Sequence, residues 1–157
     1  MPRRSTKENK TAYQRSRERA GLTREAAAER MAFISAARLE KIENERSELH
    51  PEEVLAMAEA YADPMLRNTY CTQECPIGKK YVPPLEEKSI SQITLEMCVT
   101  LNELMRDRDR LMEITVDGTI TQDEVKDFQS IRENLDRMSF AIESLKLWVD
   151  EKMIKKK

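Results

Sequence analysis

The sequence predicts an all-α protein built from two kinds of helical segment. Its 157 residues include only three glycines and few aromatic residues, a composition that favours helices over strands. Apolar residues recur at spacings of three and four along most of the chain, which is the period of one helix face. We therefore expect short helices with tight turns up to residue 70 and two long helices after residue 89.

Residues 10–70 predict a five-helix module. Gly21 suits the end of the first helix, because glycine readily takes the left-handed conformation that closes a helix. Thr23 and Ser35 are suited to cap the next two helices, and Pro51 suits the first turn of the fourth. A fifth short helix completes the module. Each helix is too short to be stable alone, so we expect one shared core. Its predicted members are Tyr13, Leu22, Ala27, Met31, Ile34, Leu39, Ile42, Val54, Leu55, Ala58 and Tyr61.

Residues 71–89 lose the helical period. They contain Pro76, Gly78, Pro83 and Pro84, a composition that indicates a linker.

Residues 90–154 predict a long antiparallel helical hairpin, similar to a coiled coil. Asp117 and Gly118 make its turn, and Thr121 with Glu124 forms a capping box for the second helix. The same stretch partly matches a calcium-binding loop, although the turn and the cap explain it without an ion. The first stripe holds Ile90, Ile93, Met97, Leu101, Leu104, Leu111 and Ile114; the second holds Phe128, Ile131, Leu135, Met138, Ile142, Leu145 and Val149.

A two-helix hairpin buries one seam and leaves its other faces uncovered. We therefore expect a homodimer through residues 90–154, in which two hairpins form a four-helix bundle. The alternative is that the hairpin folds back over the N-terminal module of the same chain.

Charge is distributed unevenly along the chain. Residues 1–46 hold twelve Lys and Arg against seven Glu, a balance of +5, whereas residues 85–157 hold twelve basic against sixteen acidic residues, a balance of −4. The basic N-terminal part favours double-stranded DNA as a partner.

Other functional classes find little support. No run of about 18 apolar residues exists, so we expect no membrane span and place the protein in the cytoplasm. We find no catalytic constellation, metal site, cofactor motif or small-molecule site, and the single histidine, His50, precedes a helix-starting proline. Cys71 and Cys75 stand four apart, a spacing that leaves a thiol or metal sensor as a remote alternative. Cys98 is expected in the hairpin core.

The segments GLTREAAAERM and ISAARLEKIEN resemble the helix-turn-helix of the lambda-repressor-like family, the Cro/repressor and xenobiotic-response-element group. The resemblance implies a sequence-specific DNA-binding transcriptional regulator that is not an enzyme. Carried over onto this sequence, it places base and phosphate contacts on the start of both motif helices and on a basic N-terminal arm. The implied DNA-binding residues are Arg24, Ser35, Ala36, Ala37, Arg38, Lys41, Arg3 and Arg4.

Two features of this segment leave its function open. Alanine cannot hydrogen-bond a base, so we expect polar discrimination to rest on Arg38 and Lys41. The turn MAFIS holds one residue more than the family pattern, which either lengthens the turn or rotates the end of the first motif helix by about 100°. The alternative function is a protein–protein interaction module, an adaptor or antitoxin-like protein that keeps the fold without reading DNA.

Overall fold

The computed structural model describes residues 9–116, 118, 119 and 121–154, and the secondary structure within these residues is entirely helical. This confirms the all-α class. The chain divides into two compact units: the first holds residues up to Pro84 together with those from Asp150 on, and the second holds Leu85–Val149. None of the described helices is long and apolar enough to cross a membrane.

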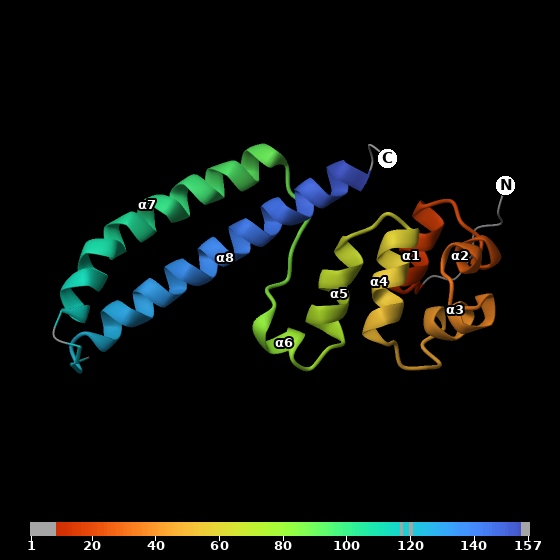
Figure 1. Ribbon diagram of the computed structural model, residues 1–157, viewed down its shortest axis with the longest axis horizontal. Coiled ribbons are helices and arrows are strands. Elements are labelled where there is room, and N and C mark those ends of the chain that lie inside the picture. The colour runs from red at the N-terminus through yellow and green to blue at the C-terminus, as the bar shows by residue number, and fades with distance from the viewer. Residues whose placement is uncertain (1–8, 117, 120, 155–157) are drawn as a thin grey trace. The chain divides into compact units, whose positions relative to one another are not determined.

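Five short helices form the body of the first unit (Figure 1). The side chains of Thr23 and Ser35 accept hydrogen bonds from backbone N–H groups in the first turns of the second and third helices, as expected. Gly21 has a φ of 71° and ends the first helix, again as expected. The helices are α1 (Ala12–Arg19), α2 (Arg24–Arg30), α3 (Ala36–Glu43), α4 (Pro51–Ala60) and α5 (Met65–Gln73).

The core of this unit matches the expected set with one error. Leu55 was expected in the core but is 57% exposed, and Met57 is buried instead. The buried apolar residues of α4 are Val54, Met57 and Ala58, and with Tyr61, which caps the C-terminus of the helix, they follow i, i+3, i+4 and i+7 spacing. Leu55 falls outside that face. Leu49 and Leu66 add to the core.

The segment predicted as a linker is partly helical, so this expectation was wrong in two places. Helix α5 continues through Gln73, and a short helix α6 spans Gly78–Tyr81. A Cβ atom on Gly78 would lie 2.1 Å from the carbonyl oxygen of Cys71, so only glycine fits where α6 meets α5. Cys71 and Cys75 are half-buried free thiols.

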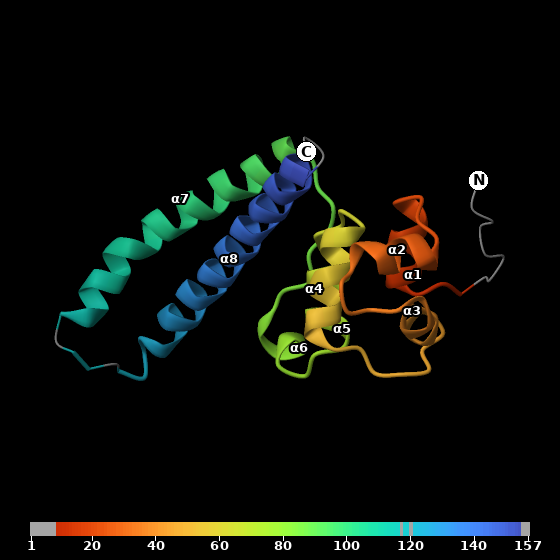
Figure 2. The same cartoon turned by 45° about the vertical axis from the view of Figure 1, so that its right-hand side comes forward.

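The second unit is the expected helical hairpin. Helices α7 (Ile90–Thr115) and α8 (Val125–Ile154) run side by side in both views (Figures 1 and 2). The Glu124 carboxylate accepts from both the Thr121 backbone N–H and the Thr121 hydroxyl at 2.8 Å, which is one half of the expected capping box. The Glu124 backbone N–H donates to the Thr121 carbonyl oxygen, and α8 begins at Val125. Asp117 and Ile120 of the expected turn lie outside the described residues.

Part of each predicted stripe forms the seam between α7 and α8. Ile93 and Ile114 of α7 and Ile131 and Met138 of α8 are buried. Polar residues interrupt the seam near its middle: Asn134 donates to Asp107, and the Arg137 guanidinium lies 3.0 Å from Glu103. Cys98 is exposed, so its expected place in the core was wrong.

Candidate nucleic-acid interface

Helices α2 and α3 pack against each other and contribute to one core. Ala27 of α2 and Leu39 of α3 are fully buried. The Ser35 hydroxyl accepts from the Arg38 backbone N–H at 3.2 Å and thereby fixes the first residue of α3. The pair therefore has the order of two packed helices and an intervening turn that a helix-turn-helix requires.

The segment MAFIS forms the turn between α2 and α3. Helix α2 ends at Arg30, and the turn keeps a buried anchor at each end, Met31 and Ile34. Between these anchors Ala32 and Phe33 point outward, and Phe33 is 64% exposed. Both anchors belong to the same core as Leu39 and Ile42, the buried apolar residues of α3.

A cluster of three charged side chains, Arg17, Arg24 and Glu43, holds α3 on the side that faces the domain. Glu43 is 1% exposed, and its carboxylate accepts from Arg17 at 2.5 and 2.9 Å and from the Arg24 Nε at 2.8 Å. Arg17 also donates to the Leu22 carbonyl oxygen at 2.6 Å. Burial lowers the pKa of Arg17, but its hydrogen bonds with Glu43 and the nearby negative charge of that carboxylate together raise the pKa above its ordinary value. The cluster ties α1, α2 and α3 together, a structural role for Glu43.

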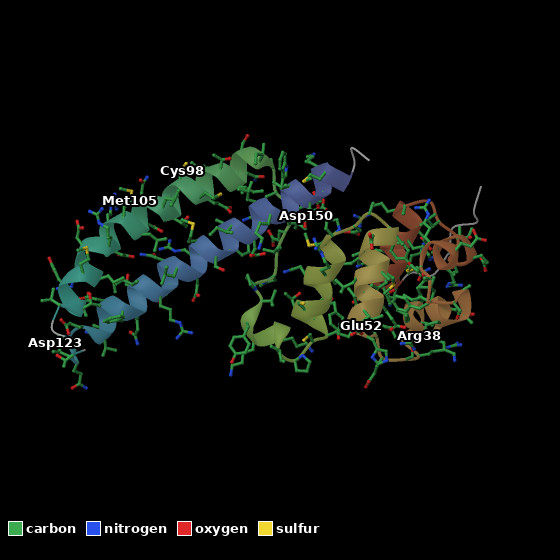
Figure 3. All side chains as sticks on the ribbon, in the orientation of Figure 1. Arg38, Glu52, Cys98, Met105, Asp123 and Asp150 are labelled. Carbon is green, nitrogen blue, oxygen red and sulfur yellow. The ribbon has the colours of Figure 1, made fainter. Side chains whose placement is uncertain are left out.

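The Arg38 side chain makes hydrogen bonds within the domain. Its side chain lies between α3 and the start of α4 (Figure 3). Its Nε and one terminal nitrogen donate to the two oxygens of Glu53 at 2.6 and 2.8 Å. Further hydrogen bonds reach the Ser47 hydroxyl at 2.8 Å and the Glu48 carbonyl oxygen at 2.6 Å. Four of the five guanidinium N–H groups are therefore engaged within the domain.

The two partners also shift each other's ionisation. The hydrogen bonds from Arg38 hold the pKa of Glu53 below its ordinary value, and those same bonds raise the pKa of Arg38. The pair joins α3 to α4, which is a positioning role that the sequence pattern did not indicate because Glu53 is fifteen residues away.

The outward face of α3 carries few polar groups. Ala37 and Lys41 are exposed and stand one helical turn apart, with Glu40 beside them. Ala36 is half-buried, and Ser35 is engaged as the cap. Arg24 is half-buried against Glu43 at the start of α2. Arg3 and Arg4 of the expected arm lie outside the described residues.

The charge on this face is nearly balanced. Exposed Lys41 and Arg46 stand in the same stretch as exposed Glu40 and Glu45, while Arg24 and Arg38 each pair with a carboxylate of the domain. The exposed aromatic ring of Phe33 is the feature that the sequence analysis did not assign; the added residue in the turn was its only signal. In the described part of the chain, no three His, Cys, Asp or Glu side chains are grouped so as to hold a metal ion.

Comparison with protein families agrees with this geometry. Residues 14–64 match the family model described as a helix-turn-helix domain, and these residues run from α1 to the end of the α4–α5 connection. Searches of curated proteins and of solved structures found no match to the chain. The chain therefore contains a helix-turn-helix domain at residues 14–64.

Proposed function

We propose that the protein is a sequence-specific DNA-binding transcriptional regulator that acts as a homodimer. The observation that carries the DNA-binding part is the exposed face of α3, held out by the buried Arg17–Glu43–Arg24 cluster. In helix-turn-helix proteins this helix lies in the major groove and its N-terminal residues contact base edges. Ala36 and Ala37 permit close approach, Lys41 supplies a donor one turn later, and Arg24 stands at the start of α2. Ser35 holds the end of α3 through its cap.

Lys41 is the residue to test. We expect Lys41→Ala to cost about 1–3 kcal/mol of binding on a site recovered by selection and much less on random DNA, which is the behaviour of a base-reading residue. Fluorescence anisotropy with both duplexes measures the two costs. Lys126→Ala removes an exposed lysine from α8 and serves as the charge-matched control. An equal loss on both duplexes would assign Lys41 to phosphate contact and reject its reading role.

The dimer proposal rests on apolar side chains that the hairpin leaves exposed. Leu101, Met105 and Met112 on α7 and Leu135 and Ile142 on α8 are all exposed. Their helical spacing, applied to two antiparallel helices joined at the observed seam, places them on one side of the hairpin. Figure 3 shows Met105 on the edge of α7 away from α8. A contiguous apolar surface of this kind marks an interaction site.

A second copy of the same hairpin fits this surface. Both stripes have coiled-coil spacing, and two such hairpins related by a two-fold axis bury the same stripe on each copy. We expect the full chain to sediment as a dimer and Met105→Glu with Leu135→Glu to sediment as a folded monomer. Leu95→Glu is the matched control, because Leu95 is exposed on the opposite side, in a groove of about 450 Å³ shared with Val99 and Phe140. A monomeric wild-type chain would reject the dimer.

The near balance of charge on α3 favours one alternative function, a protein–protein interaction module of the adaptor or antitoxin type. In that case the exposed Phe33 and Ala37 would contact a protein, since fewer phosphate-neutralising charges are then needed. Absence of DNA binding at moderate salt, in a folded full-length protein, would favour this alternative.

A further inference from the structure

The α3 face has little capacity to read bases by hydrogen bonds. Arg38 directs its guanidinium into the domain, and Arg24 donates its Nε to Glu43. Ser35 is held as the helix cap. Of the described residues expected to discriminate bases by polar contacts, Lys41 is the one whose side chain is exposed on the outward face. Discrimination between bases that depended only on hydrogen-bond donors of the α3 side chains would therefore be weak.

Apolar groups occupy the same end of α3. Phe33 is 64% exposed although its neighbours Met31 and Ile34 are anchored in the core. It stands two residues before the cap Ser35, so its ring lies at the N-terminal end of α3, and Ala37 is exposed in the first turn of the helix. Phe33 belongs to the turn MAFIS, and the buried side chains of Met31 and Ile34 on either side fix the position of this turn on the domain.

We propose that Phe33 and Ala37 form an apolar surface that recognises the 5-methyl groups of thymines in the major groove. This inference rests on the proposed DNA-binding function and names what that site reads. Thymine is the base that presents a methyl group in the major groove, and apolar side chains contact it there. The N-terminal end of the second helix is the part of a helix-turn-helix that reaches base edges. The alanines at the start of α3 and the exposed Phe33 ring thus serve the same contact with thymine methyl groups.

The experiment compares two forms of one duplex. A site recovered by selection with the full chain is synthesised with thymine and then with deoxyuridine at each thymine position, which removes the methyl groups and keeps every hydrogen-bonding group. We expect affinity to fall about fourfold for each contacted methyl group, the factor that corresponds to one buried methyl-sized group. Fluorescence anisotropy at fixed salt measures both affinities.

Variants then locate the contact. Phe33→Ala should bind the thymine duplex more weakly and lose most of the difference between the two duplexes. Leu55→Ala is the matched control, because Leu55 is also an exposed apolar residue but lies on α4; it should keep the full difference. Thermal unfolding of both variants shows that each is folded, as expected for exposed positions.

The outcomes separate this inference from the proposed function. Specific binding that is equal for the thymine and uracil duplexes, or a methyl effect that persists in Phe33→Ala, overturns the inference and leaves DNA binding in place. Failure of the folded wild-type chain to bind any DNA overturns both and assigns the Phe33 surface to a protein partner.

Discussion

At the scale of single residues, charged side chains of similar appearance in the sequence have different roles. Lys41 and Arg38 both belong to α3, yet Lys41 is exposed and Arg38 is bound to Glu53, Ser47 and Glu48. The helical pattern could place Leu39 and Ile42 in the core, because burial follows the period of the helix. It could not identify the partner of Arg38, since that partner is on another helix.

Removal of the Arg38 side chain should cost stability. Arg38→Ala leaves the buried Glu53 carboxylate without its main partner, and we expect a loss of about 1–3 kcal/mol in the free energy of unfolding. Urea unfolding measures this loss. Lys41→Ala on the same helix should change stability by less than about 0.5 kcal/mol, as exposed positions do. Unchanged stability in Arg38→Ala, together with a loss of binding on the selected site alone, would restore Arg38 as a base-reading residue.

The lowered pKa of Glu53 predicts a stability change in acid. The folded-state pKa lies below the ordinary value of 4.5, so the Arg38–Glu53 contribution is fully present above pH 4.5 and is lost as the pH falls through the lower folded-state pKa. Glu53→Gln removes this titration. Urea unfolding from pH 7 to about pH 3 should therefore show a shallower fall in stability for the variant than for the wild type. Parallel curves for the two proteins would contradict the assignment.

At the scale of helices, the sequence predicted starts better than ends. Thr23 and Ser35 cap their helices as expected, because a side-chain oxygen before an apolar pattern is a local signal. The end of α5 was missed, because the expected breaker Pro76 stands three residues beyond Gln73. Leu55 was misplaced for a different reason: a helix with many apolar residues offers more than one candidate face.

Loss of the α3 cap should weaken the domain. Ser35→Ala removes the acceptor for the Arg38 backbone N–H, and we expect a cost of about 1 kcal/mol in the free energy of unfolding. Ser35→Asp keeps an acceptor at the cap and should retain most of the stability. Urea unfolding of both variants tests this; an equal loss in the two variants would show that the cap hydrogen bond is not the cause.

At the scale of the whole molecule, two apolar stripes predicted the hairpin. These stripes contain more apolar side chains than the seam between α7 and α8 buries. Leu135 and Ile142 belong to the predicted second stripe yet remain exposed, whereas Ile131 and Met138 of the same stripe are buried. A helix in a two-helix hairpin buries only the residues along the seam. A wider apolar stripe therefore leaves some of its side chains exposed. Periodicity shows how wide a stripe is but not what covers its outer part, which is why the partner is a proposal.

Dimerisation should control DNA affinity. If two chains bind two half-sites together, the second contact is intramolecular and strengthens binding by a large factor. The doubly substituted Met105→Glu and Leu135→Glu chain should therefore bind a duplex with two half-sites at least tenfold more weakly than the wild type, with about tenfold corresponding to 1.4 kcal/mol. It should bind a single half-site equally well. Gel-shift titration on both duplexes measures the two affinities. If the variant and the wild type bind the double site with equal affinity, the exposed hairpin surface does not contribute to DNA binding.

Selection from random-sequence DNA by the purified full-length chain tests whether the protein reads DNA as a two-fold dimer. We expect enrichment of one motif that occurs as two inverted halves, with centres about 10 base pairs or a multiple of that apart, because a two-fold dimer presents two copies of α3 to the same face of the duplex. The motif should show a preference for thymine at the positions that Phe33 and Ala37 contact. Absence of any enriched motif at about 0.1 M salt, from a protein shown to be folded, would contradict the account.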